Sequence, residues 1–150
     1  MFKKILVPLD RSPLAEKALP YALSLAEQYK AEILFLVVLQ SMPTHIMGGE
    51  MSIYSISLIE DNIKEEKIKT QAYLSELVEM HSRDNVTINT LMLEASSVAD
   101  GIVDTASNEQ IDVIVKTTHG RSGPSRWLFG NVATKVLQQA PCPIFLVRVQ

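Results

Sequence analysis

The segment from Thr117 to Asn131 has the residue types and spacing best suited to binding phosphate. It contains the glycines Gly120, Gly123 and Gly130 and the cations Arg121 and Arg126. Glycine lets the backbone approach a ligand closely. A helix beginning near Gly130 would also direct unpaired N–H groups, at the positive end of its dipole, toward phosphate oxygens. We interpret the segment as a phosphate-binding loop, and an ordinary surface turn rich in glycine is the alternative.

Two common phosphate-binding motifs do not describe this segment. A Walker A loop would open its helix with Gly-Lys-Ser or Gly-Lys-Thr, and no such triplet is present. The dinucleotide fingerprint should follow the first strand, where the chain instead reads Asp10-Arg11-Ser12-Pro13 without a glycine. The segment therefore predicts a different kind of nucleotide loop.

Two side chains that could act as an acid, a base or a ligand contact lie in these segments: Asp10 after the first strand, and His119 in the glycine-rich segment. Asp10 could contact a ligand or help to cap the helix that follows it, and the two roles are compatible. His119 could contact a phosphate or act as an acid or base, although a single loop histidine is more often only solvated. No second histidine or cysteine stands at metal-ligand spacing, so we expect no metal site made by protein ligands alone. Mg²⁺ could still arrive with a nucleotide.

Short apolar runs alternate with longer helical periods along the chain. The predicted strands are residues 5–9, 33–39, 86–93, 111–115 and 143–149, and the predicted helices are residues 14–29, 53–81, 99–106 and 132–139. Ser12 is expected to cap the first helix, with Pro13 as its first residue. Strands joined by helices pair in parallel through right-handed crossovers. The pattern predicts a three-layer, doubly wound α/β sheet.

In such a sheet, ligands bind outside the carboxyl ends of the strands, where the strand order reverses. The loops after the first and fourth predicted strands, Asp10–Pro13 and Thr117–Asn131, are therefore expected to line one crevice. None of the other prominent segments is interpreted as part of a reactive centre. The charged side of the helix over residues 53–81 is interpreted as a solvated surface, the methionines near residues 42–51 as part of a mobile loop, and Trp127 as a packing residue.

Composition limits the classes of partner. The chain has 150 residues, 47% of them hydrophobic, which suits one domain spanning residues 1–150. Its net charge of −3 argues against non-specific binding to nucleic acid or to an anionic membrane. The single Cys142, the absence of a signal segment and the absence of a long apolar run favour a cytoplasmic protein.

Three segments give the chain a resemblance to the universal stress protein family that covers essentially its whole length. They are Lys4-Ile5-Leu6-Val7-Pro8-Leu9-Asp10, Thr118-His119-Gly120-Arg121-Ser122-Gly123 and Pro141-Cys142-Pro143-Ile144-Phe145-Leu146-Val147. The resemblance implies five parallel strands in the order 3-2-1-4-5, in the adenine-nucleotide α-hydrolase-like fold. It also implies a homodimer formed through the last strand, Pro143 to Val149.

Members of this family that bind ATP carry a spaced glycine pattern, which this chain matches in part. The pattern is Gly, two residues, Gly, nine residues, then Gly and Ser or Thr. Gly120 and Gly130 occupy the second and third glycine positions, whereas Thr117 replaces the first glycine and Asn131 replaces the hydroxyl residue. Thr117 could offer its own hydroxyl to a phosphate, and Asn131 keeps an amide donor and its backbone N–H.

The resemblance implies an ATP site, with magnesium as a possible companion ion. Asp10 would face the ribose or adenine, Val38 would line the adenine, and Val115 and Thr117 would form the base of the pocket. The full expected set is Pro8, Asp10, Val38, Val115, Thr117, His119, Gly120, Arg121, Gly123, Gly130, Asn131 and Val132.

The function expected from these features is that of an ATP-binding stress-response protein that acts as a dimeric sensor or signalling module. Two alternatives stay open: a slow ATP hydrolase or phosphotransferase, and a dimeric stress protein that does not bind ATP. Efficient phosphoryl transfer needs an organised metal and a positioned base. The sequence offers no base that we can place near a γ-phosphate, so no catalytic residue is predicted.

Overall fold

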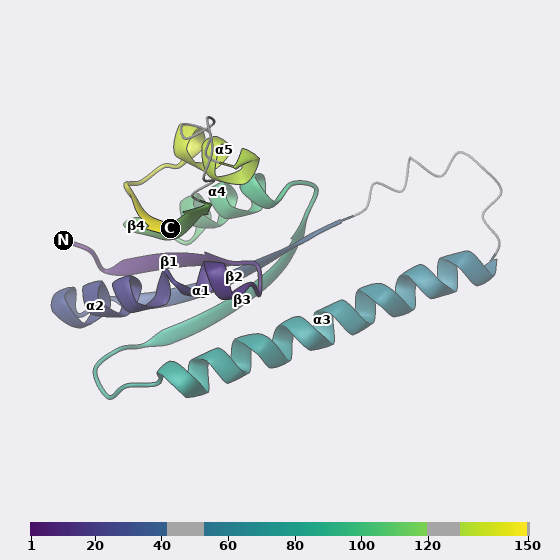
Figure 1. Ribbon diagram of the computed structural model, residues 1–150, viewed down its shortest axis with the longest axis horizontal. Helices are drawn as coiled ribbons and strands as arrows, with labels where there is room; N and C mark the ends of the chain where they lie inside the picture. The colour runs from purple at the N-terminus through teal and green to yellow at the C-terminus, as the bar shows by residue number, and fades with distance from the viewer. Residues whose placement is uncertain (42–52, 120–129, 150) are drawn as a thin grey trace.

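The computed structural model describes residues 1–41, 53–119 and 130–149 (Figure 1). The strands are β1 (Lys4–Leu9), β2 (Glu32–Gln40), β3 (Ile88–Ala95), β4 (Val113–His119) and β5 (Ile144–Val149). The helices are α1 (Pro13–Glu16), α2 (Leu19–Tyr29), α3 (Ile53–His81), α4 (Val98–Asn108) and α5 (Asn131–Gln139).

The strands form a five-stranded parallel sheet in the order β3-β2-β1-β4-β5. Helices α1, α2 and α3 lie on one side of it, and α4 and α5 lie on the other (Figure 1). The predicted three-layer architecture and the predicted strand order are both confirmed.

Two apolar clusters fill the spaces between the sheet and its helices. Ile5 and Val7 of β1 belong to the cluster that includes residues of α1, α2 and α3. Leu6, between them, belongs to the cluster under α4 and α5. Because successive side chains of a strand point to opposite faces, a strand covered on both sides needs apolar residues at every position. This requirement explains the continuous apolar run of β1.

The first predicted helix, residues 14–29, is divided in the structure into α1 and α2. Pro20 explains the break, because a proline ring inside a helix clashes with the carbonyl four residues earlier. That residue is Glu16, where α1 ends. The predicted start is confirmed: Ser12 caps α1, its hydroxyl accepting the Ala15 N–H at 3.1 Å, and Pro13 is the first helical residue.

Strands β3 and β4 both extend further toward their carboxyl ends than predicted. β4 was expected to end at Val115, but it pairs with β5 as far as His119 opposite Val149. Residues 117–119 therefore belong to a strand and not to a loop. The partner strand determines this boundary, because pairing with β5 satisfies the backbone groups that a local reading assigns to a turn.

Pro8 limits the pairing between β1 and β4. The Lys4 carbonyl accepts the N–H of Asp112, on the β4 side, whereas the Lys3 carbonyl accepts that of Glu32, on the β2 side. In a parallel sheet the backbone N–H and C=O groups of successive residues point alternately to the two neighbouring strands. Pro8 is four residues after Lys4, so its backbone also faces β4, where it has no N–H to donate.

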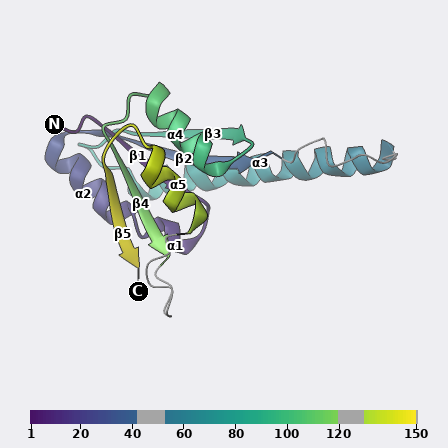
Figure 2. The ribbon, with the colours of Figure 1, turned by 90° about the horizontal axis from the view of Figure 1, so that it is seen from above.

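The ladder follows this rule. β1 pairs with β4 only as far as Leu6 opposite Ile114, but with β2 as far as Leu9 opposite Val37. Figure 2 shows β4 and β5 running at an angle to β1, β2 and β3. The sheet therefore opens at its carboxyl edge, between β1 and β4.

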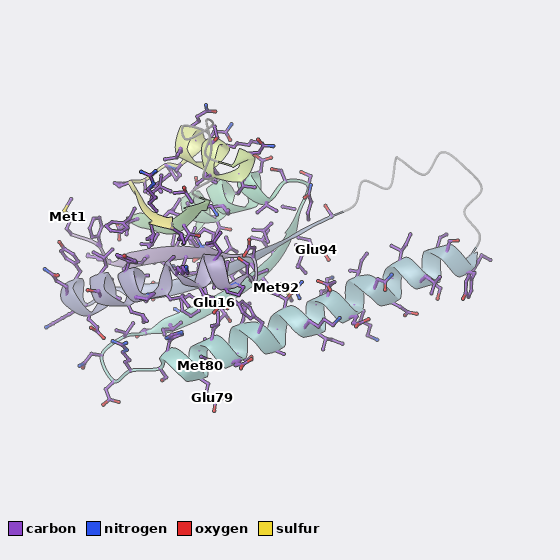
Figure 3. The ribbon with its side chains drawn as sticks, in the orientation of Figure 1. Met1, Glu16, Glu79, Met80, Met92 and Glu94 are labelled. Carbon is purple, nitrogen blue, oxygen red and sulfur yellow. The ribbon has the colours of Figure 1, made fainter. Side chains whose placement is uncertain are left out.

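Helix α3 runs well beyond the sheet (Figure 1). Its fully buried residues are Thr70, Leu74 and Leu77, all in its second half. Near its start, Ile53 and Tyr54 are 87% and 73% exposed. Lys67 of α3 pairs with Glu94 of β3 at 2.7 Å; Figure 3 labels Glu94 on its strand, along with Met80 near the end of α3. Within the described ranges, none of the helices combines the length and apolar character needed to span a membrane.

Candidate functional site

A cavity of about 270 Å³ lies at the carboxyl edge of the sheet, where β1 and β4 separate. It is lined by Pro8, Leu9, Asp10, Ala15, Leu36, Val38, Val98, Ile102, Lys116, Thr117, Gly130, Asn131, Val132 and Ala133. The two loops that sequence reasoning assigned to one crevice both contribute to it, through Asp10 and through residues 117, 130 and 131. Because β1 and β4 are not paired here, the cavity arises from the backbone itself.

Asp10 lies exposed at the end of β1, within a small hydrogen-bonded turn. Its Oδ1 accepts the Ser12 hydroxyl at 2.5 Å and the Ser12 N–H at 3.0 Å. Burial acts to raise the pKa of Asp10, but these hydrogen bonds and the attraction of Lys116 outweigh it and hold the pKa below its ordinary value. Asp10 is thus an acceptor that stays ionised at neutral pH. It supports the Ser12 cap without being the cap itself.

Arg11 adopts a left-handed backbone conformation with a φ of 64°, which is uncommon for a residue other than glycine. Its guanidinium pairs with Glu66 of α3 at 2.5 Å, while the neighbouring Asp10 lines the cavity. Tyr73 of α3 donates to Glu16 of α1 at 2.9 Å. Together these contacts attach α3 to the elements that follow β1, next to the site.

Lys116 of β4 lines the cavity, although sequence reasoning did not select it. The side chain is half-buried. Burial lowers the pKa of Lys116, and the negative charge of Asp10 opposes part of that shift. The sequence signal was a lysine inside the run Val113-Ile114-Val115-Lys116, which was missed because the strand was expected to end at Val115.

The start of α5 forms another wall of the cavity. Gly130 is its N-cap, and its carbonyl accepts the Thr134 N–H at 2.9 Å. Glycine has no side chain that could accept a hydrogen bond, so the N-cap residue does not satisfy the first N–H groups of α5. Asn131, Val132 and Ala133 follow along the cavity wall. This end of the helix is suited to an anion.

Gly130 does not need the conformational freedom of glycine. Its φ is −54°, an ordinary value for other residues. A Cβ placed on it would meet nothing within 4 Å among the described residues. What glycine provides here is open space beside the first N–H groups of α5.

The structure places most of the expected residues around the cavity. Those that line it are Pro8, Asp10, Val38, Thr117, Gly130, Asn131 and Val132. Gly120, Arg121 and Gly123 lie outside the described residues, as does the side chain of His119, whose backbone ends β4. Whether these residues bind a ligand stays a prediction.

Val115 does not line the cavity. It is 0% exposed and belongs to the core cluster of Val7 and Val113, on the face covered by α1, α2 and α3. The alternation of side chains along β4 gives the physical reason, because Val115 must point away from the face that Lys116 shares with Leu36 and Ile102.

The cavity therefore combines apolar walls with a few polar groups. Among its described lining residues, Asp10 and Lys116 are the two charged ones. No group of three or more potential metal-ligating side chains occurs in the part of the chain that the structure describes. Apolar walls, one carboxylate, one ammonium and a helix N-terminus suit a ligand with a flat apolar part and an anionic part.

Comparison with known proteins gives consistent results. The family model for the universal stress protein family matches residues 1–148. The chain is 33% identical to the universal stress protein MJ0531 of Methanocaldococcus jannaschii over 148 residues, which cover 99% of this chain and 83% of that one.

Solved structures share the fold. The universal stress protein UspA of Lactobacillus plantarum superposes with a TM-score of 0.78 at 21% identity, covering 98% of each chain. The universal stress protein of Archaeoglobus fulgidus in complex with dAMP superposes with a TM-score of 0.64 at 20% identity, covering 97% of each chain.

Proposed function

The chain belongs to the universal stress protein family. On that premise we propose that its cavity binds an adenine nucleotide, as its partial match to the glycine pattern of ATP-binding members predicts. One observation carries the proposal: the ionised Asp10, apolar walls and the open N-terminus of α5 all border the same 270 Å³ cavity. The dAMP complex of a protein with the same fold supports an adenine nucleotide as the ligand class.

The lining residues suggest how the parts of a nucleotide are distributed. Pro8, Leu36 and Val38 offer apolar surface to the base. The Asp10 carboxylate accepts hydrogen bonds from ribose hydroxyls, as acidic residues do in other nucleotide sites. The N–H groups at the start of α5 face the phosphates, and the bare backbone of Gly130 leaves room for them.

We favour a binding role over hydrolysis. Among the described residues of the cavity, Asp10 is the single carboxylate, and this proposal assigns its two oxygens to the Ser12 turn and to the ribose hydroxyls. A general base must be free to accept a proton from the attacking group. In this proposal the protein is a cytoplasmic sensor of adenine nucleotides, and magnesium arrives with the ligand.

We also propose that the protein is a homodimer assembled through β5. This strand is at the edge of the sheet. Its Phe145 is 42% exposed and packs against Tyr21, itself 49% exposed, with 5.8 Å between ring centroids. An open strand edge flanked by exposed aromatic rings is a surface suited to pairing with a second copy.

The nucleotide site can be tested at Gly130. We would titrate ATP, ADP and AMP by calorimetry into the wild type, Gly130→Asp and Gly130→Asn. Aspartate and asparagine are both favourable N-caps of similar size, so neither should weaken α5. A Cβ at residue 130 would meet nothing within 4 Å among the described residues, so both variants should fold. The Asp variant should bind at least about tenfold more weakly than the Asn variant, because its charge repels phosphate.

Two results would contradict the proposal. If no adenine nucleotide binds the wild type at millimolar concentration, the function is wrong. If the Asp and Asn variants bind equally well, the phosphates do not lie at the start of α5. A steady-state turnover assay with Mg²⁺ would separate a binding protein from a hydrolase, and denaturing the purified protein would release any nucleotide that co-purifies.

A further inference from the structure

Lys116 brings a cation into the cavity that the glycine pattern of the loop does not account for. It extends from the face of β4 that is covered by α4 and α5, into a space whose walls include Leu36, Val38 and Ile102. Surrounding protein removes water from the ammonium, and this desolvation is the main cause of its lowered pKa. A partly desolvated charge is costly unless something compensates it.

The described part of the chain offers Lys116 little compensation. Four other lysines reach a carboxylate at 2.7–2.8 Å, namely Lys4, Lys67, Lys69 and Lys135. For Lys116, the described residues show no hydrogen bond or ion pair, only longer-range attraction to Asp10. One oxygen of the Asp10 carboxylate, Oδ1, is in turn engaged by Ser12. The Lys116 ammonium is thus available to an incoming acceptor.

The position of Lys116 identifies the part of a nucleotide that it would meet. β4 lies beside β1, which ends next to Asp10, and it leads to the segment that precedes α5. Lys116 shares the cavity with the carboxylate assigned to the ribose and with the helix start assigned to the phosphates, and it is close enough to Asp10 for the two charges to interact. In a 5′-nucleotide, the group between ribose and outer phosphates is the first phosphate.

We propose that Lys116 binds the phosphate attached to the nucleoside, so that the first phosphate contributes more to affinity than any later one. This inference rests on the proposed function, because it assumes that a nucleotide occupies the cavity. It makes the site a receptor for nucleoside 5′-phosphates in which AMP already makes the strongest ionic contact. Lys116 is then the residue that distinguishes a nucleotide from a nucleoside.

A binding series on the wild type tests this directly. Calorimetric titration with adenosine, AMP, ADP and ATP should show the largest gain in affinity between adenosine and AMP. A hydrogen bond to a charged group predicts a gain of about tenfold to a hundredfold for that step. That step should shrink as salt is raised, because the contact is ionic. A larger gain from AMP to ADP than from adenosine to AMP would overturn the inference.

Lys116→Met, which keeps the length of the side chain and removes its charge, supplies the second test. AMP affinity should fall at least about tenfold while adenosine affinity changes less than about twofold, and Lys116→Arg should keep most of the AMP affinity. An equal loss for adenosine and AMP would mean that Lys116 contacts the base or ribose instead. Unchanged AMP affinity would mean that it contacts neither.

The two proposals fail in different ways. If the wild type binds none of these ligands, the proposed function is wrong and this inference falls with it. If the wild type binds AMP and Lys116→Met binds it equally well, only the inference is wrong. Thermal melting of each variant checks folding, and the wild-type series decides the matter if a variant does not fold.

Discussion

Gly101 is a single residue of α4 whose lack of a side chain lets the helix pack closely against Val38 and Leu93, beside the cavity. A Cβ placed on it would lie 2.8 Å from Cγ1 of Val38 and 3.2 Å from Cδ1 of Leu93. Valine is stiff about χ1 and cannot turn away easily. Val38 also lines the cavity, so a side chain at residue 101 that displaced this valine would change the cavity wall.

We expect Gly101→Ala to lower stability and to weaken nucleotide binding. The gain in helix propensity is about 1 kcal/mol, but crowding against Val38 costs about 1–3 kcal/mol, so a net loss of about 1 kcal/mol should appear in urea denaturation. Affinity should fall because Val38 is displaced. Asp104→Ala, at an exposed position of the same helix, is the control: it should raise stability by about 0.5 kcal/mol through helix propensity alone and leave affinity unchanged. Higher stability with full affinity in Gly101→Ala would contradict this reasoning.

The residues around the cavity were predictable where they follow a motif or end a strand. Asp10 and Pro8 follow from the first strand, and Gly130, Asn131 and Val132 follow from the helix start. Val115 and Lys116 were not, because ending the strand at Val115 left Lys116 outside it. An alternating strand assigns neighbouring residues to opposite faces, so extending β4 moves the pocket residue from the valine to the lysine.

At the scale of elements, the sequence predicted the types of element and their order better than their ends. Periodicity located α3 at residues 53–81, which is confirmed. The division of α1 from α2 was predictable in principle from Pro20, whose effect was overlooked. The end of β4 was not accessible from local sequence, because pairing with β5, 30 residues further on, supports it as far as His119.

Helix α3 should be unevenly stable along its length. Its 29 residues would extend about 44 Å at 1.5 Å per residue, yet its fully buried side chains are confined to Thr70, Leu74 and Leu77. A helical segment without tertiary packing is only marginally stable in water. The first half of α3 therefore depends on the second half for its structure.

Hydrogen exchange can measure this gradient. Amides of residues 56–64 should exchange at least about tenfold faster than those of residues 72–78, because local opening costs less where few side chains are buried. Peptides from α4, which buries residues from Ala99 to Ala106, provide a well-protected reference. Uniform protection along α3 would contradict the expectation.

At the scale of the whole molecule, the proposed dimer depends on the edge strand. We expect Phe145→Lys to convert a dimer into a monomer in sedimentation or light-scattering measurements, weakening association at least about tenfold, because it places a charge in the proposed interface. Leu137→Lys, on α5, replaces another exposed apolar residue that is 38% exposed and should leave the dimer intact. A wild-type mass equal to that of one chain would show that β5 does not mediate assembly.

At the β1–β4 boundary, the backbone determines where the cavity lies and the side chains determine what can bind in it. The opening between β1 and β4 lies where the strand order reverses, and Pro8 adds to it because this residue has no N–H to donate toward β4. Cavity walls can thus be exchanged one by one without closing the space, which makes ligand choice a property that can be redesigned independently of the fold. Replacing Leu36, Val38 or Lys116 would alter which ligand fits the cavity, whereas the place of the cavity follows from the order of the strands.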